Sequence, residues 1–215
     1  MVKSFAFNPF QENTYIVSDR TKECIIIDPG CYDASEKKQL ETYIKTNDLK
    51  PVRLLNTHCH IDHVFGNSFV HERWGLPLEI HSGELPVLNQ VPMIANAYGL
   101  AYPEPSPAPE AFLEHGDLIE FGDSKLKIFL TPGHSPASIS FYNAQEGYLI
   151  AGDVLFRESI GRTDLPGGDF KTLLDSIQTH FWTLPDAVEV FPGHGPSTTI
   201  GYEKVNNPFL NGSLK

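Results

Sequence analysis

The densest group of potential metal ligands in this sequence lies within residues 57–63. The run Thr-His-Cys-His-Ile-Asp-His places three imidazoles and one carboxylate within six positions. Imidazole suits zinc, copper, iron and nickel, and a carboxylate adds a hard anionic ligand, so the run could hold two cations. If the backbone stays extended, His58 and His60 share a face and could hold one ion. Asp62 and His63, at the turn into a helix, could then face a second ion.

Three further candidate ligands each follow a short apolar run and a glycine. His134, Asp153 and His194 close the segments Thr-Pro-Gly-His, Ala-Gly-Asp and Phe-Pro-Gly-His. Glycine lets the backbone turn sharply and approach an ion closely. The repeated order of strand, glycine turn and ligand favours one site assembled from several loops over a chance set of surface histidines.

Short apolar segments are expected to position these ligands. Residues 52–56 are apolar and bounded by Pro51, so they are predicted to form a buried strand with the histidines at its carboxyl end, where α/β sheets form sites. Strands are also predicted ahead of the other ligands, at 126–130, 148–150 and 188–190.

The first third of the chain is expected to begin as an antiparallel sheet and continue with a helix. Residues 14–17 and 24–27 are predicted strands on either side of a turn. Asp33 and Glu36 are spaced as a capping box for a helix over 33–46. Further elements are expected at 2–7, 67–74 and 78–80.

Two features of the second half are less regular. Prolines at alternate positions of 103–109 predict an extended, stiff segment, either a surface connector or a substrate lid. A later helix carries one apolar stripe that we expect to be core, formed by Phe170, Leu173, Leu174, Ile177 and Phe181.

Length and composition favour a single soluble domain spanning residues 1–215. The formal net charge of −11 disfavours nucleic acid and anionic membranes as partners. Neither a signal peptide nor a membrane-length apolar run is evident, and the three cysteines lack CxxC spacing, so a reducing, cytoplasmic location is expected. Cys59 is interpreted as a small buried packing residue. The oligomeric state stays open.

The spaced set of five histidines and two aspartates resembles that of the metallo-β-lactamase superfamily and, within it, the glyoxalase II-like hydrolases. The resemblance runs from the first strand to the C-terminus and is to a short form without the C-terminal helical domain. It implies an α+β fold, the four-layer αββα sandwich. It also implies that one metal is held by His58, His60 and His134, and the other by Asp62, His63 and His194, with Asp153 bridging the two.

The chemistry expected of such a site is hydrolysis. Two divalent cations about 3.5–4 Å apart can hold a water between them and lower its pKa to about 7, which generates a bridging hydroxide nucleophile at neutral pH. The same ions polarise a carbonyl and stabilise the oxyanion. Asp62 and Asp153 are the expected catalytic carboxylates, and zinc is the expected metal, with iron or manganese as alternatives. The resemblance implies a small-molecule thioester substrate, S-2-hydroxyacylglutathione or a related acyl thioester.

Two residues outside the ligand set receive candidate roles. Arg162 lies in a Gly-Arg-Thr-Asp segment similar to those of short bacterial glyoxalase II-like proteins and of persulfide dioxygenases. Its guanidinium could bind a substrate carboxylate, or pair with Asp164 or Asp169 in a structural loop. Asp28 could orient a ligand histidine or accept hydrogen bonds in an Asx turn.

The sequence departs from full-length glyoxalase II in ways that leave other substrates open. It has no counterpart of the basic helical extension that grips glutathione, and Gly195-Pro196 replaces an acidic residue and a tyrosine. The alternatives are a metallohydrolase of another ester or lactone and a mononuclear iron persulfide dioxygenase using two histidines and one aspartate. A non-catalytic protein whose metal ties its loops together is a third. Metal content distinguishes the iron enzyme from the dinuclear hydrolase.

Overall fold

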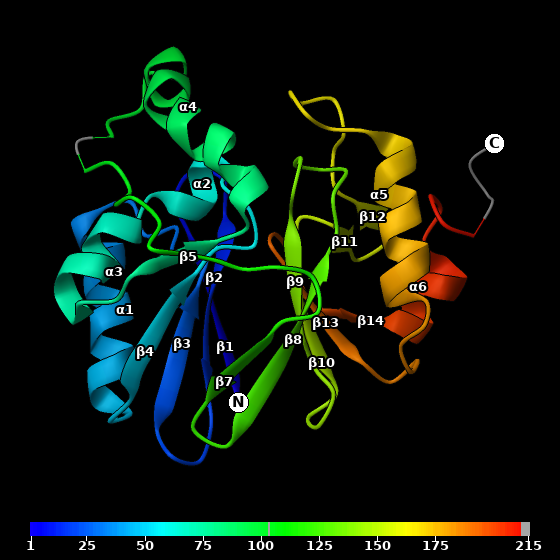
Figure 1. The fold of residues 1–215 in the computed structure, drawn as a ribbon, viewed down its shortest axis with the longest axis horizontal. Helices are drawn as coiled ribbons and strands as arrows, with labels where there is room; N and C mark the ends of the chain where they lie inside the picture. The colour runs from blue at the N-terminus through cyan, green and yellow to red at the C-terminus, as the bar shows by residue number, and fades with distance from the viewer. Residues whose placement is uncertain (103, 212–215) are drawn as a thin grey trace. The chain divides into compact units, whose positions relative to one another are not determined.

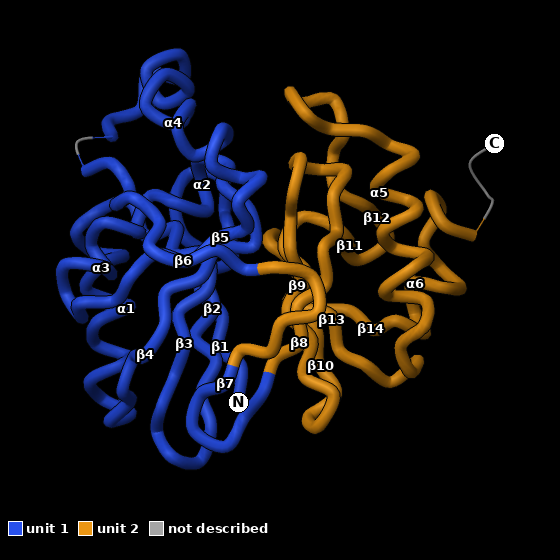
Figure 2. The backbone as a smooth tube through the Cα atoms, viewed as in Figure 1, with its two compact units in different colours: residues 1–113, 120–125 blue, residues 114–119, 126–215 orange. Residues whose placement is uncertain are grey.

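The computed structural model describes residues 1–102 and 104–211, and its contacts divide the chain into two compact units. Unit 1 comprises residues 1–113 and 120–125, and unit 2 comprises residues 114–119 and the chain from 126 onward (Figure 2). Each unit is built on a sheet of six strands. The expectation of a single domain stays a prediction.

The sheet of unit 1 runs in sequence order (Figure 1). Its strands are β1 (Val2–Phe7), β2 (Glu12–Ser18), β3 (Glu23–Ile27), β4 (Lys50–Leu55), β5 (Leu78–Ile80) and β6 (Ala111–Phe112). Strands β1 to β3 pair antiparallel, as predicted, and β3 to β6 pair parallel. Pro51 lies inside β4 instead of before it. Because proline has no N–H to donate, the ladder is irregular there, with a register shift opposite Cys24 and Ile25.

The helices of unit 1 begin and end at residues with clear signals. They are α1 (Ala34–Thr46), α2 (Ile61–Val64), α3 (Asn67–Trp74) and α4 (Leu85–Ala97), with a short 3₁₀ turn, η1 (Ser82–Glu84), before α4. The capping box at α1 is confirmed, because Asp33 accepts from the backbone of Glu36 and Glu36 accepts in return. Gly75 ends α3 in the left-handed conformation, with φ 67°. Leu40 of α1 and Val70 of α3 are fully buried in a core shared with Ile26 and Leu54.

The second sheet, most of whose residues belong to unit 2, has the order β14-β13-β10-β9-β8-β7. Its strands are β7 (Leu118–Phe121), β8 (Ser124–Leu130), β9 (Ile139–Asn143), β10 (Tyr148–Gly152), β13 (Glu189–Pro192) and β14 (Thr198–Thr199). The pair β10–β13 is parallel, which brings the carboxyl ends of both strands to the same edge. A small separate ribbon is formed by β11 (Leu155–Phe156) and β12 (Ser159–Ile160).

Only part of the apolar stripe predicted for the later helix belongs to the hydrophobic core of unit 2. It lies on α5 (Phe170–Ser176) and the π turn η2 (Ile177–Phe181), and a last helix, α6 (Ile200–Asn206), follows later. Leu173, Ile177 and Phe181 are fully buried. The prediction is wrong for Phe170, which is 48% exposed. Phe170 is the first residue of its helix, directly after the cap Asp169, so no earlier turn covers its ring.

The proline-rich segment begins at Pro103, which lies outside the described residues. From residue 104 to 110 the backbone has neither helix nor strand, as expected. Within the described chain, residues 1–102 and 104–211, no helix is long and apolar enough to cross a membrane.

We expect substitutions in the buried and exposed parts of the stripe to differ in their effect on the stability of the protein. Replacing Leu173 with Ala should lower the free energy of unfolding by about 2–5 kcal/mol, because it opens a cavity in the core. Phe170→Ala should lower it by less than about 1 kcal/mol. Denaturant unfolding of both variants measures this difference, and equal losses would show that Phe170 belongs to the core.

Candidate metal centre

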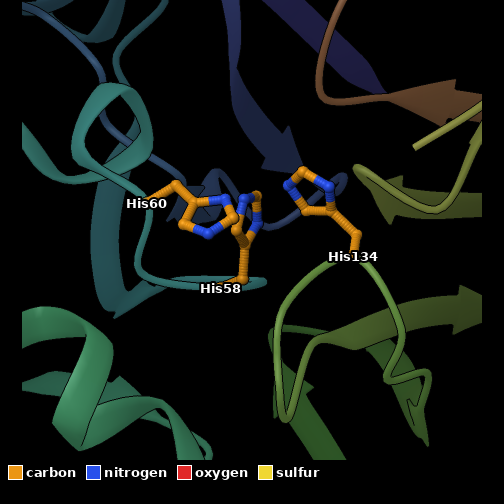
Figure 3. Close-up of side chains that lie close together, drawn as sticks. All are labelled: His58, His60 and His134. Carbon is orange, nitrogen blue, oxygen red and sulfur yellow. The ribbon is translucent and has the colours of Figure 1, made fainter. Parts of the chain in front are cut away.

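The ligand-rich run of unit 1 lies directly after β4 and leads into α2. Residues 56–60 are irregular, and His60, with extended φ and ψ of −64° and 153°, precedes the first turn of α2. The rings of His58 and His60 are 4.8 Å apart between centroids and nearly perpendicular (Figure 3, which also draws His134 of unit 2). The rings of His58 and His63 are 4.1 Å apart. Asp62 places a carboxylate oxygen 3.8 Å from the Nε2 of His63. The short helix thus places the ring of His63 beside that of His58 and the carboxylate of Asp62 beside His63.

Asp28 is the buried carboxylate that holds this loop in place. Its Oδ1 accepts the backbone N–H of Thr57, and its Oδ2 accepts the Thr57 hydroxyl, both at 2.6 Å. The same Oδ2 lies 3.1 Å from Nδ1 of His63. The Thr57 hydroxyl is also 3.1 Å from Nδ1 of His58. Of the two roles considered for Asp28, the structure therefore shows the contact with a histidine, and it leaves Nε2 of His63 as the nitrogen that can face an ion.

A chain of buried amides supports the same loop and was missed in the sequence. Asn56 donates to the carbonyl of His63 at 2.9 Å and accepts from Asn67 at 2.9 Å. Asn67 in turn donates to the hydroxyl of Ser106 at 3.1 Å. This connects the proline-rich segment to the ligand loop. The signal available in the sequence was an asparagine, Asn56, directly before the ligand run. The sequence did not show its partners, because Asn67 and Ser106 are 39 residues apart and meet only in the tertiary structure.

Glu12 is a second buried acid near the ligands of unit 1. Burial raises the pKa of Glu12 well above its usual range, and the nearby His63 opposes that shift. One carboxylate oxygen of Glu12 accepts from the Thr14 hydroxyl at 3.0 Å, and the other lies 3.9 Å from Nδ1 of His63. Gly30 packs directly against this carboxylate, so a side chain there would collide with it.

Unit 2 brings its own predicted ligands together around Asp153. The three follow β8, β10 and β13, as the repeated strand, glycine and ligand pattern predicted. Oδ2 of Asp153 lies 3.4 Å from Nε2 of His134 and 3.5 Å from Nε2 of His194. Asp153 and His134 are buried, while the His194 side chain is 28% exposed. One carboxylate oxygen thus stands at nearly equal distance from two imidazoles.

The loop that carries Arg162 orients His134 through its backbone. The Arg162 carbonyl lies 2.8 Å from Nδ1 of His134, which turns the Nε2 of that ring toward Asp153. The Arg162 guanidinium is held by Asp164 through two hydrogen bonds of 2.7 Å, and this pairing lowers the pKa of Asp164 to about 2. Asp169 instead caps α5. The structural pairing considered for Arg162 is present, and a substrate role stays a prediction.

Gly133 shows why a glycine precedes His134. Its φ is 129°, a region that L side chains rarely adopt, and a Cβ there would lie 2.3 Å from the backbone nitrogen of Leu173. The backbone N–H of Asp169 also donates to the Gly133 carbonyl at 2.8 Å. The turn before His134 is therefore packed against the start of α5.

The chemistry of the donor set fits transition-metal ions. Within unit 1, the rings of His58 and His63 are 4.1 Å apart, and a carboxylate oxygen of Asp62 lies 3.8 Å from Nε2 of His63. In unit 2, Asp153 faces two imidazoles. Nitrogen and carboxylate oxygen donors of this kind suit zinc, iron and manganese, and the backbone and carboxylate contacts at Nδ1 are those expected behind metal-binding histidines.

Fold and site together define a class. The model of the metallo-β-lactamase superfamily matches residues 7–194, so this chain belongs to that superfamily, whose members are metal-dependent hydrolases. The predicted α+β fold of that superfamily is confirmed.

Particular relatives resemble the chain over nearly its whole length. "Probable metallo-hydrolase YqgX" of Bacillus subtilis is 40% identical over 95% of this chain and 94% of its own. "Hydroxyacylglutathione hydrolase GloC" of Haemophilus influenzae is 35% identical over 94% of each.

Solved structures show the same fold. The BLEG-1 B3 metallo-β-lactamase has a TM-score of 0.87 at 38% identity and covers 98% of this chain and 99% of its own. The protein TTHA1623, solved in a di-iron-bound form, has a TM-score of 0.87 at 39% identity over 97% of this chain and 100% of its own. ETHE1 from Myxococcus xanthus has a TM-score of 0.79 at 25% identity over 99% of this chain and 85% of its own.

We predict that Asp28→Ala weakens metal binding by roughly 10- to 100-fold, because it removes the group that orients His63 and Thr57. Competition with a fluorescent chelator measures the affinity for zinc. The control is Asp175→Ala, which removes an exposed carboxylate of α5 and should leave the affinity unchanged. Equal affinities for the two variants would contradict the orienting role of Asp28.

Proposed function

We propose that this protein is a dinuclear thioester hydrolase of glyoxalase II type, acting on S-2-hydroxyacyl thioesters. The observation that carries the proposal is the position of Asp153, whose Oδ2 lies at 3.4 and 3.5 Å from the Nε2 atoms of His134 and His194. A single oxygen placed in this way suits a carboxylate shared by two ions. The similarity to the Haemophilus influenzae hydroxyacylglutathione hydrolase supports the choice of substrate class.

In this proposal the ligands divide between two ions. His58, His60 and His134 would hold one ion, Asp62, His63 and His194 would hold the other, and Asp153 would serve both. The ions are proposed to be zinc, with iron or manganese as alternatives, because this mixture of imidazole and carboxylate accepts all three metals.

The reaction adds water to the acyl carbon and breaks the carbon–sulfur bond, which yields a carboxylic acid and a thiol. When bound, the two ions supply Lewis acidity that polarises the carbonyl and lowers the pKa of water. The carboxylate of Asp62 is proposed to orient the attacking water and to accept its proton. Asp28 and Thr57 keep the imidazoles of His58 and His63 in a fixed orientation during turnover, so the site requires little reorganisation.

The alternative function is that of a mononuclear iron persulfide dioxygenase. The structural similarity to ETHE1 from Myxococcus xanthus, at 25% identity, is the observation that supports this alternative. Such an enzyme would use only two histidines and one aspartate. The dinuclear hydrolase is favoured because it also uses His60, His63 and the other ligands of the pattern.

The proposed partners are small molecules, with no role for nucleic acid or membrane. The net charge of −11 opposes association with either polyanion. We also propose a cytoplasmic location, since Cys24, Cys31 and Cys59 are all free and buried.

We expect the purified protein to hold about two transition-metal ions per chain, and Asp153→Ala to lower the occupancy of both sites, because one carboxylate serves both ions. Elemental analysis after dialysis gives the stoichiometry. Asp175→Ala again serves as the control. Two tightly held ions and normal turnover in Asp153→Ala would exclude the bridging role, and one iron per chain with oxygen consumption would favour the dioxygenase.

We also expect hydrolysis of an S-lactoyl thioester to show an acidic limb near neutral pH that moves when the metal is changed. The reason is that the limb reports ionisation of water at the ions, whose acidity depends on the metal. The measurement is kcat/KM against pH for zinc-loaded and manganese-loaded protein. A limb at the same pH for both metals would instead assign it to a side chain.

A further inference from the structure

A groove of about 330 Å³ in unit 2 contains one of the proposed metal ligands. It is lined by Phe156, Arg157, Glu158, His194, Gly195 and Pro196. The ring of Phe156 lies 6.3 Å from that of His194, nearly perpendicular to it. A substrate whose carbonyl reacts beside His194 can therefore extend into a groove that also carries a guanidinium.

We propose that Arg157 binds a carboxylate carried on the thiol part of the substrate. The inference rests on the proposed thioester hydrolysis. The acyl part of a 2-hydroxyacyl thioester is small and must lie at the ions, so a remote charge of the substrate belongs to its thiol part. A guanidinium stays protonated at every physiological pH and matches the two oxygens of a carboxylate with its fork of donors.

The turn that carries Arg157 is fixed firmly to the rest of unit 2. Arg157 and Glu158 form the two-residue connection between β11 and β12, and Glu158 has a positive φ of 57°. The backbone N–H of Glu158 donates to the fully buried Glu203 of α6 at 2.9 Å. Asn207 donates to the carbonyl of Ser159 at 3.0 Å. These hydrogen bonds fix the backbone of the turn that carries Arg157, which limits the conformational entropy lost when a ligand binds.

The Arg157 side chain is placed by an aromatic ring. Its guanidinium carbon lies 4.4 Å from the centroid of Tyr202, a cation–π contact. The Tyr202 hydroxyl donates to Oε1 of Glu158, which fixes the ring and engages the acid next to Arg157. Over residues 1–102 and 104–211, the structure shows no ion pair between Arg157 and a carboxylate. The ring orients the guanidinium without neutralising it.

Arg162, the arginine singled out in the sequence, differs in this respect. Asp164 already occupies two of its donors at 2.7 Å. A substrate carboxylate would have to displace that partner, whereas at Arg157 it would meet a stacked guanidinium with positive charge. In a chain of net charge −11, such a group is a distinctive feature of the surface next to a metal ligand.

The test compares two thioesters that differ in one charge, S-lactoyl-3-mercaptopropionate and its methyl ester. Arg157→Gln should lower kcat/KM for the acid by roughly 5- to 50-fold, mainly through KM, and change that for the ester by less than about twofold. Arg157→Lys should be intermediate, because lysine keeps the charge but loses the fork. Arg20→Gln, an exposed arginine of unit 1 paired with Asp123, is the control and should match the wild type on both substrates.

Two further variants test the placement by Tyr202. Tyr202→Leu removes the aromatic face and should weaken use of the acid, while Tyr202→Phe keeps the face and should retain most of it. Equal losses on acid and ester in Arg157→Gln, or no loss on either, would overturn the proposal. Melting temperature and metal content of each variant show whether a loss is instead structural.

A binding measurement separates this inference from the proposed function. The probe is the non-hydrolysable ketone analogue of each substrate, with a methylene between carbonyl and sulfur, and calorimetry gives its Kd. Arg157→Gln should raise Kd for the acid analogue by a factor similar to that in kcat/KM and leave Kd for the ester analogue unchanged. If the wild type hydrolyses neither thioester, the proposed function fails, and a selective loss of acid binding still supports the Arg157 site. Unchanged binding of the acid analogue would exclude it.

Discussion

The buried carboxylate of Asp28 is the contact on which the ligand loop of unit 1 depends. Placing imidazoles and carboxylates together away from water costs free energy unless each polar atom has a partner. Asp28 satisfies the Thr57 backbone and hydroxyl, and it lies beside Nδ1 of His63. A loop without regular secondary structure is thereby held in place by buried hydrogen bonds.

In unit 2, backbone groups hold the candidate ligands in position. The Arg162 carbonyl contacts His134, and the Gly133 turn is packed against Leu173 in the first turn of α5. Gly161 follows the same principle, because a Cβ there would lie 1.9 Å from the carbonyl oxygen of Asp153. These close approaches explain why glycines flank the ligands. The Gly-Arg-Thr-Asp segment thus contributes to the site through its backbone as well as through any side-chain role.

The two arginines near the site show how structure changes the interpretation of a charge. Arg162 lies in the more distinctive motif, yet its guanidinium is held by Asp164. Arg157 lies in a two-residue turn with no evident pattern, yet it stacks on Tyr202 beside the groove that contains His194. An arginine is available to a ligand according to what already binds it, and a sequence motif alone does not show this.

The sequence by itself determined the elements and the kinds of ligand. Spacing predicted the α1 capping box, the antiparallel start of the first sheet and the strands that lead to the ligands, because these depend on local hydrogen bonds and on alternation of apolar residues. The ligand pattern also indicated the superfamily.

Tertiary structure decided which distant groups meet. The contact of Asp28 with His63, the amide chain from Asn56 to Ser106 and the stacking of Arg157 on Tyr202 join residues that are remote in sequence. Phe170 continues the helical stripe in sequence but is exposed, because only the packing of a helix end decides whether its first residue is covered. Local patterns record the propensity of a segment, and partners across the fold depend on how whole elements pack.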